Sequence, residues 1–279
     1  MGNAENVNKN RLSVLAVPKL NELLQKSKIM QFLDLRSTNL TDAGLAMLVE
    51  GLPFCSTLFN LNIAKNDITS SGMEKFAPIL HRTAISELDI SLNPLGNNGV
   101  RCLAENLWEK VYHHITLSQR ETISVTELNF RDVDKYSNGK KCALLKLNLS
   151  ETKLQESGAN HLFKNLLDFY SLQHLNIDHN CFQVHKMSAF SSLVKQSRLH
   201  TLSMNYCKLG NEGGVSLGDA LLLSNSMRDL RAKSCDFGDT AAKAFAACLE
   251  DNPTLERLDL SNNLINDAGG ELLGISIAQ

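Results

Sequence analysis

The sequence predicts an α/β solenoid, a horseshoe in which parallel strands line the concave face and helices cover the convex face. Three observations lead to this prediction. Apolar residues stand two apart in short stretches, which is the spacing of a β-strand. Each stretch is followed by an apolar run at helical spacing. The pair recurs about every 28 residues, and a period of this length is typical of a solenoid.

The repeat unit has a fixed frame of residue types, which the last copy shows most clearly. Counting Leu255 as position 1 places Leu258 at 4, Leu260 at 6, Asn263 at 9 and Gly269 at 15. The copy that begins at residue 125 keeps only part of this frame. About nine repeats are predicted, and they begin at residues 30, 58, 85, 125, 144, 172, 199, 227 and 255.

Each position of the frame has a physical reason. Apolar side chains at positions 1, 4 and 6 point into the solenoid and pack against neighbouring repeats. An Asn at position 9 can both donate and accept where the chain leaves the strand, and we expect it to bond the turn of the next repeat. The Gly at position 15 lets the backbone approach closely as the helix begins. Weaker donors hold position 9 at Thr38, Thr152, Cys207 and Cys235.

The whole array is predicted to be one curved domain over residues 12–279, with a disordered tail at 1–11. Residues 12–29 are predicted to form a helical N-terminal cap. Strands stack about 4.8 Å apart and packed helices about 8–10 Å apart, so the array must curve. The C-terminal end has no polar capping element, and solenoids need capped ends. We therefore expect that the protein continues beyond this end or that a partner covers it.

The middle of the chain breaks the regular period. Between the starts at 85 and 144 lie 59 residues. Residues 108–124 are predicted to extend the third repeat, and residues 131–143 to replace the helix of the fourth. A second register, with Tyr112, Ile115 and Leu117 in the fourth strand, is the alternative. Insertions in a solenoid often carry binding specificity, so this region is either a recognition loop or a tolerated insertion.

The pattern LxxLxLxxNxLxxxG with a 28-residue step resembles the leucine-rich repeats of the ribonuclease-inhibitor type, over nearly the whole chain. This resemblance implies a non-enzymatic scaffold that binds a protein partner through its concave face and irregular loops. Many unrelated functions use such a scaffold, so the partner stays open.

Two other functions are compatible with this resemblance. Similar repeats occur in cytoskeletal, ciliary and actin-regulating proteins, including tropomodulin and the CARMIL family, and in sensor domains of innate-immune receptors. The Ran GTPase-activating protein is also similar, and it would imply a regulator of a small GTPase. Arg120 and Arg131 lie in or beside the irregular segments, but neither matches a motif of that family, and the acidic tail of that family is not present.

Composition and motifs argue against several classes of protein. A net charge of −2 and a pI near 6.4 give no electrostatic footprint for nucleic acid. The seven cysteines are odd in number and contain no CxxC pair, which favours reduced structural thiols in a cytoplasmic protein. We find no phosphate-binding loop, no nucleophile elbow and no zinc spacing. The sequence therefore predicts no enzyme, no catalytic residue, no cofactor and no metal.

Membrane association is not predicted either. No apolar run is long enough to span a bilayer, and no signal-peptide core stands near the start. Gly2 is compatible with N-myristoylation, but Asn6 stands where Ser or Thr is preferred, and no basic cluster supplies a second membrane signal. We expect an unmodified tail and a cytoplasmic location, with a cytoskeletal or ciliary one as the alternative.

The predicted binding site lies on the concave face, at strand positions 2, 3, 5, 7 and 8. There the centre is acidic, the C-terminal third is basic, and two histidines and a tyrosine fall in neighbouring strands. Aromatic and Arg residues anchor many interfaces. The partner-binding candidates are His174, Asp178, His179, Tyr206, Arg231 and Arg257. Secondary candidates are Glu87, Asp89, Glu127, Arg131 and Asp132. An apolar pair, Phe32 and Phe59, is the alternative, although the capping segment could cover it.

Overall fold

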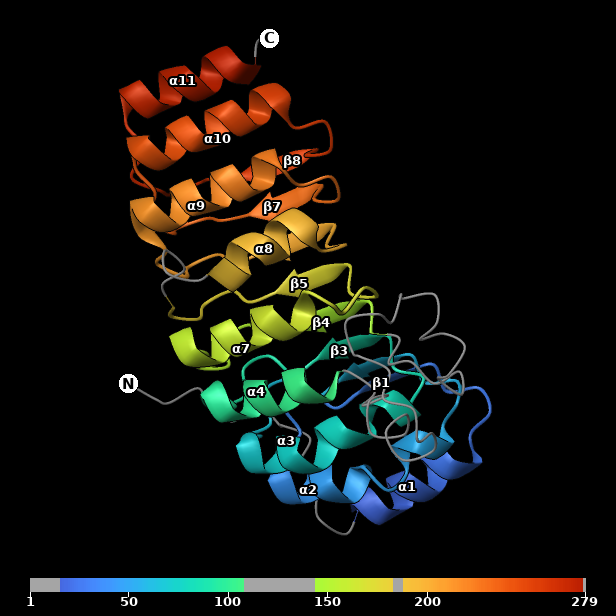
Figure 1. Cartoon of the computed structure of the whole chain (residues 1–279). Helices are drawn as coiled ribbons and strands as arrows, with labels where there is room; N and C mark the ends of the chain where they lie inside the picture. Colours follow the sequence, from blue (N-terminus) through green and yellow to red (C-terminus); the bar gives the residue numbers. More distant parts are fainter. Residues whose placement is uncertain (1–15, 108–143, 183–187, 278–279) are drawn as a thin grey trace, which may run out of the picture.

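The computed structural model describes residues 16–107, 144–182 and 188–277. Helices form one layer and short parallel strands form the other, and the two layers curve together along the array (Figure 1). The strands are β1 (Phe32–Asp34), β2 (Asn60–Asn62), β3 (Glu87–Asp89), β4 (Lys146–Asn148), β5 (His174–Asn176), β6 (Thr201–Ser203), β7 (Asp229–Arg231) and β8 (Arg257–Asp259). The α-helices are α1 (Ala16–Lys26), α2 (Thr41–Leu48), α3 (Ser70–Phe76), α4 (Gly96–Asn106), α7 (Glu156–Leu166), α8 (Ser188–Gln196), α9 (Gly210–Leu222), α10 (Asp239–Asp251) and α11 (Asp267–Ile277), with 3₁₀ turns η1 (Leu52–Phe54) and η2 (Ala77–Arg82).

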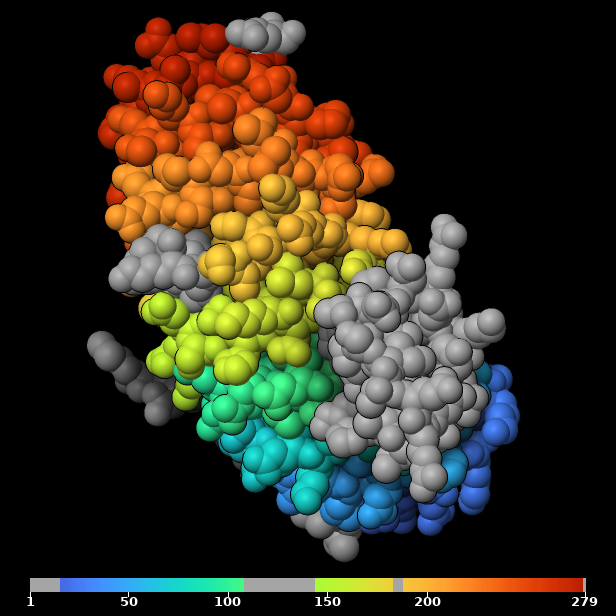
Figure 2. Space-filling model, viewed as in Figure 1, coloured from blue at the N-terminus to red at the C-terminus, as the bar shows by residue number. Residues whose placement is uncertain are grey.

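The eight described strands form one parallel sheet in chain order. Residues at position 4 stand opposite one another, as in the pairing of Leu61 with Leu88 and of Leu202 with Leu230. From α7 to α11, each helix packs against the next along the convex side, and Figure 2 shows the closed surface that they make there. The predicted solenoid is therefore confirmed.

The core lies between the two layers. Leu61 and Ile63, at positions 4 and 6, are fully buried, as are Leu45 and Leu48 on α2. The last repeat differs, because its position-4 and position-6 leucines in and beside β8 are only half-buried. The cap forms a helix as predicted, and Val17 and Leu24 on α1 enter the core.

Two strands that are not consecutive in the predicted repeat count lie side by side in the sheet. Strand β3 is hydrogen bonded directly to β4, with Leu88 opposite Leu147, and the Leu145 N–H donates to the Ser86 carbonyl at 2.7 Å. No described strand therefore stands between them, and the predicted repeat that begins at 125 and its alternative register stay predictions. Those residues, with both predicted insertions, lie outside the described parts of the chain. The sequence that begins at residue 125 keeps the apolar spacing of the frame. Its position 9 is Val133, whose side chain cannot form a hydrogen bond.

The position-9 Asn bonds the preceding repeat, not the next one as predicted. The Asn66 side-chain oxygen accepts from the backbone N–H groups of Thr38 at 2.9 Å and Leu40 at 3.1 Å. Its amide donates back to the Leu35 carbonyl at 2.7 Å. Parallel stacking explains the direction, since the Asn side chain lies beneath the turn of the earlier repeat. Where Cys207 replaces Asn, its thiol donates to the Ile177 carbonyl at 3.3 Å, so the expected weaker donation is confirmed.

A second set of cross-repeat bonds, from position 13, was not expected. The Asn97 side-chain oxygen accepts from the Gln155 N–H at 2.9 Å, at the start of α7 in the following repeat. Asp42, Asn211 and Asp239 make the same forward contact. The predicted close approach at position 15 is present beside it, because a Cβ on Gly158 would lie 2.7 Å from the Asn97 oxygen. Helix starts are thus satisfied by the repeat before them.

Among the helices in the described parts of the chain, none is both long enough and apolar enough to cross a lipid bilayer.

Candidate functional site

The position-5 side chains of the concave face mostly serve the backbone of their own repeat. The Asp89 carboxylate accepts from the Ser91 N–H at 3.0 Å, and the Asn62 side chain accepts from the Ala64 N–H at 3.0 Å. The same contact forms at Asp34, Asn148, Asn176 and Asp259. Asp89, a secondary candidate, is therefore committed to the turn that ends its strand.

Strands β6 and β7 depart from this rule, because Ser203 and Arg231 hold position 5. Their missing acceptor comes from the preceding repeat. The Asp178 carboxylate accepts from the Asn205 N–H at 2.7 Å and from the Ser203 hydroxyl at 2.7 Å. The Asn205 side-chain oxygen accepts from the Lys233 N–H at 2.8 Å. Asp178 thus joins two repeats, and in the described structure its carboxylate holds the Ser203 and Asn205 groups of the next repeat in place.

Sequence reasoning missed these bonds, although a signal was present. The repeats of β6 and β7 carry Cys207 and Cys235, in place of Asn, at position 9. The same two repeats lack Asn or Asp at position 5. Thiols form only weak hydrogen bonds, so another polar residue has to supply the hydrogen bonds between these neighbouring repeats. Asp178 and Asn205, both at position 7, do so from the concave surface.

The centre of the concave face holds a hollow of about 330 Å³ that reaches from β2 to β7. On one wall the Lys146 ammonium lies 2.6 Å from the Glu87 carboxylate. The Asn60 amide donates to the other Glu87 oxygen at 2.7 Å. The hydrogen bond from Lys146, opposed by partial burial, lowers the pKa of Glu87. Partial burial, then the charges of Lys146 and His200, lower the pKa of His174. Among the described residues of the predicted acidic centre, Glu87 is thus paired with a lysine.

An aromatic stack lies beyond the carboxyl ends of β5 and β6. The His179 and Tyr206 rings are parallel, with centroids 4.3 Å apart and an interplanar angle of 14°. The Lys233 ammonium stands 5.9 Å from the Tyr206 centroid, in the next repeat. Both ring residues have a left-handed backbone, with φ of 54° and 60°. Tyr206 is 41% exposed, so the stack is accessible.

The basic end of the face is largely neutralised. The Arg231 guanidinium binds Asp229 through two nitrogens, the closer at 2.7 Å, and the hydrogen bonds raise the pKa of Arg231. The Arg257 guanidinium lies 4.0 Å from the same carboxylate. Arg228 pairs with Glu256 at 2.8 Å. Three arginines of the predicted basic third therefore lie beside carboxylates, because Asp229 stands in β7 and Glu256 directly precedes β8.

The predicted aromatic patch is two separate groups. His174 begins β5 and lies against the His200 ring, with centroids 6.5 Å apart. His179 and Tyr206 come after the ends of their strands and stack there. His174 opens β5 and His179 lies in the turn after it, so the two histidines of this repeat make separate ring contacts at opposite ends of the strand. Glu127, Arg131 and Asp132 lie outside the described residues.

Phe32 and Phe59 form the predicted apolar pair. Their rings meet edge to face at 4.6 Å, and Phe32 keeps 63% of its surface exposed. Across the described ranges, no group of three or more His, Cys, Asp or Glu side chains could hold a metal ion.

Comparison with known proteins agrees with the repeat frame. A family model described as "Leucine Rich repeat" matches residues 26–49, 54–77, 83–104, 197–218 and 251–274. The chain is 27% identical over 263 residues to the ribonuclease inhibitor of Mus musculus, covering 92% of this chain and 57% of that protein. It is 28% identical over 252 residues to the ribonuclease inhibitor of Sus scrofa, covering 88% and 54%.

Among solved structures, an internalin C2 from Listeria monocytogenes is 20% identical with a TM-score of 0.47, covering 81% of this chain and 76% of that one. The chain spans about half the length of the two ribonuclease inhibitors that it matches. The repeat frame, the matched family model and these two relatives together support a leucine-rich repeat protein of the ribonuclease-inhibitor type.

Proposed function

We propose that this chain is a non-enzymatic scaffold that binds a protein partner through its concave face, with the His179–Tyr206 stack as the anchor. The observation that carries the proposal is a stacked, exposed aromatic pair at the edge of a curved polar surface. Tyr is enriched where interfaces derive most of their binding energy. A stacked ring is already fixed, so it loses little conformational entropy when a partner covers it.

Charged groups on the same face favour selectivity over raw affinity. The Glu87–Lys146 pair and the Asp229–Arg231 pair stand on either side of the central hollow. A partner that covers them must offer groups of both signs, since a buried charge without a partner is costly. Complementary charge suppresses wrong partners. The proposed partner is thus a folded protein with a mixed-charge surface.

A ribonuclease is the first partner to test, because two relatives are named for that inhibition. Titration calorimetry with a pancreatic-type ribonuclease measures binding directly. A double variant, His179→Ala with Tyr206→Ala, should weaken any such binding by about a hundredfold, since each lost anchor costs about 1–2 kcal/mol. The matched control is Ser234→Ala, at the same repeat position and in the same left-handed conformation one repeat later.

If no ribonuclease binds, affinity capture from source cells identifies the partner. The stack variant should lose this partner while its melting temperature stays unchanged. Equal loss by a helix-face control, Lys75→Glu with Lys195→Glu, would show that the stack is not the anchor. A further variant, with residues 131–143 shortened to a glycine-rich turn, tests the irregular segment separately. Capture of actin or of a small GTPase would instead select one of the two alternative functions.

We also propose a cytoplasmic location. The six described cysteines are all free, and the thiols of most of them are buried. Reduced thiols persist in that compartment.

A further inference from the structure

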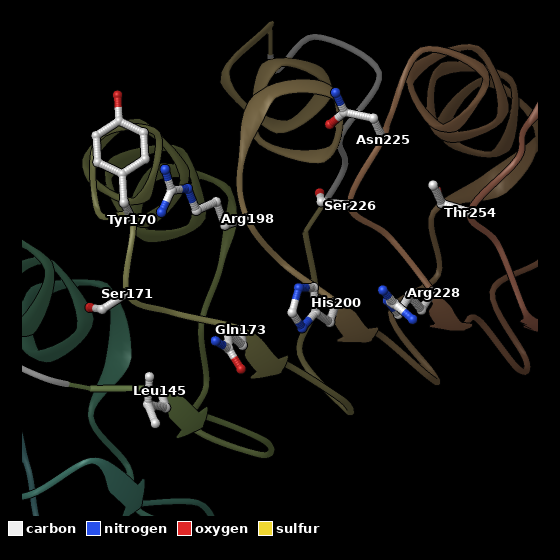
Figure 3. Close-up of a pocket in the computed structure, with 10 residues that line it drawn as sticks. All are labelled: Leu145, Tyr170, Ser171, Gln173, Arg198, His200, Asn225, Ser226, Arg228 and Thr254. Carbon is white, nitrogen blue, oxygen red and sulfur yellow. The ribbon is translucent and has the colours of Figure 1, made fainter.

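A second hollow, of about 500 Å³, lies at the opposite edge of the sheet, where the strands begin. Four consecutive loops form most of it, each leading from a helix into the next strand, β5 to β8, and Leu145 just before β4 adds to its lining (Figure 3). Neither ring of the aromatic stack lines this hollow, because His179 and Tyr206 follow the C-terminal ends of β5 and β6. The residues that line it are Leu145, Tyr170, Ser171, Gln173, Arg198, His200, Asn225, Ser226, Arg228 and Thr254.

The lining is cationic. It includes two guanidinium groups and an imidazole, and none of its ten described residues carries a carboxylate. The Arg198 guanidinium lies 5.4 Å from the centre of the Tyr170 ring, and the two side chains lie alongside each other in Figure 3. Within the described residues, no carboxylate pairs with Arg198. The guanidinium of Arg228 binds Glu256 through Nη1 at 2.8 Å, which leaves its other N–H groups available.

Neutral donors stand between the two arginines. The carboxamides of Gln173 and Asn225 make no side-chain hydrogen bond to any described residue, and both line the hollow. By contrast, the Ser226 and Thr254 hydroxyls are committed to the Ser197 and Met227 carbonyls, at 2.7 and 3.0 Å. These two free carboxamides thus lie in one hollow with the Arg198 guanidinium, which no described carboxylate pairs, and with the remaining N–H groups of Arg228. This combination suits an anion with several acceptor oxygens.

We propose that this hollow binds the anionic group of an acidic protein segment, with Arg198 and Arg228 holding the oxygens and Gln173 and Asn225 completing the hydrogen bonds. A carboxylate and a phosphoryl group both fit this donor set, since a guanidinium fork matches either one. A polyanion such as nucleic acid fits less well, because the whole chain carries a net charge of −2. The site goes beyond the proposed concave-face function and does not depend on it.

Fluorescence anisotropy with three labelled peptides tests the proposal on the full chain. The probes are hexaglutamate, hexaglutamine, and a glycine–serine hexapeptide carrying one phosphoserine. We expect hexaglutamate, the phosphopeptide or both to bind, more weakly as salt is raised, and hexaglutamine to stay free. Arg198→Gln and Arg228→Gln should each weaken binding about tenfold, the value of one charge-assisted hydrogen bond.

Two controls keep the result specific. Arg101→Gln, on α4 and paired with Glu105, changes the same net charge away from the hollow and should leave binding unchanged. The stack variant, His179→Ala with Tyr206→Ala, should bind the peptides normally, which separates this site from the concave-face function. No binding of either acidic peptide at about 1 mM would overturn the proposal. So would equal weakening by all arginine variants, or inorganic phosphate binding as tightly as the phosphopeptide.

Discussion

The side-chain oxygen of Asn205 accepts a hydrogen bond from the backbone N–H of Lys233, one repeat later, at 2.8 Å. In six described repeats, the equivalent N–H is satisfied within its own repeat by an Asn or Asp at position 5. Arg231 occupies that position here, and its guanidinium turns to Asp229 instead. A bond between repeats therefore replaces a bond within a repeat.

This replacement predicts an energetic coupling between Asn205 and Arg231. Asn205→Ala should lower the free energy of unfolding by about 1–2 kcal/mol, because the Lys233 N–H and the groups around Asp178 lose a partner. Adding Arg231→Asn should restore about 1 kcal/mol, since an Asn there can accept from Lys233. Urea denaturation of the two single variants and the double variant gives the coupling. If the two changes in unfolding free energy simply add in the double variant, an Asn at position 231 does not replace Asn205 as the acceptor for the Lys233 N–H.

The buried position-9 ladder should matter most inside the array. Asn66 is 1% exposed and satisfies two backbone N–H groups, so Asn66→Ala should destabilise the fold by about 3 kcal/mol. Asn263 makes the matched bonds to Cys235 and Phe237 but is half-buried at the end of the array. Water can replace it there, and Asn263→Ala should cost about 1 kcal/mol. Equal losses in chemical denaturation would show that burial does not set the cost.

Two glycines should respond to alanine in opposite directions. A Cβ at Gly158 would lie 2.8 Å from both the Asn97 Cα and the Leu154 side chain, so Gly158→Ala should destabilise by about 1–3 kcal/mol. Gly274, in α11, has no atom within 4 Å of such a Cβ. Gly274→Ala should stabilise by about 0.5–1 kcal/mol through helix propensity. Thermal denaturation of both variants tests the pair, and a shared sign would contradict the packing argument.

Stability should fall on mild acidification, in part because of His174. Its pKa in the folded protein is lowered from 6.5, first by burial and then by Lys146 and His200. As the pH falls below 6.5, the unfolded chain binds a proton that the folded chain resists, so stability is lost until the folded pKa is passed. His174→Gln should reduce this pH dependence, whereas His161→Gln, on the exposed side of α7, should not. Glu87, whose pKa is also lowered, acts in a separate window below 4.5. Denaturation midpoints between pH 7 and 5 give the comparison, and identical slopes in all three proteins would contradict it.

Thiol reactivity should follow burial. Burial raises the pKa of Cys235 and of Cys248 to about 11, and that of Cys207 further still. Cys181 is exposed. Brief treatment of the native protein with iodoacetamide should therefore alkylate Cys181 first among the described cysteines, and the three buried thiols only after unfolding. Peptide mass spectrometry identifies the alkylated cysteines, and Cys181→Ser is the control. Early modification of Cys207 would contradict the burial argument.

The periodic part of the structure could be predicted because one constraint repeats. Positions 4 and 6 must be apolar in every copy, so Leu88 and Leu202 identify their strands even without neighbours. The 125 copy shows the limit of that reasoning. Its apolar spacing is local, whereas membership of the sheet depends on which strand β3 pairs with, and that is a matter of long-range packing.

The candidate site was less predictable, for the same reason. His174, His179 and Tyr206 were assigned to the concave face from spacing alone, but spacing does not tell that position 8 adopts a left-handed backbone that brings two rings face to face. Nor does it tell that Asp229 neutralises Arg231. Charge pairing and ring stacking depend on rotamers, and these are set only once the strands lie side by side.

The hydrogen bonds of Asp178 and Asn205 lie on the exposed concave surface rather than in the core. A partner seated over β5 to β7 would exclude water from the bonds that hold three repeats together. Hydrogen exchange of the Asn205 and Lys233 amides should therefore slow on binding, and the opening of the array and the occupancy of its face become thermodynamically linked quantities. Under the proposed function, recognition and the stiffness of the array would depend on the same atoms in this part of the molecule.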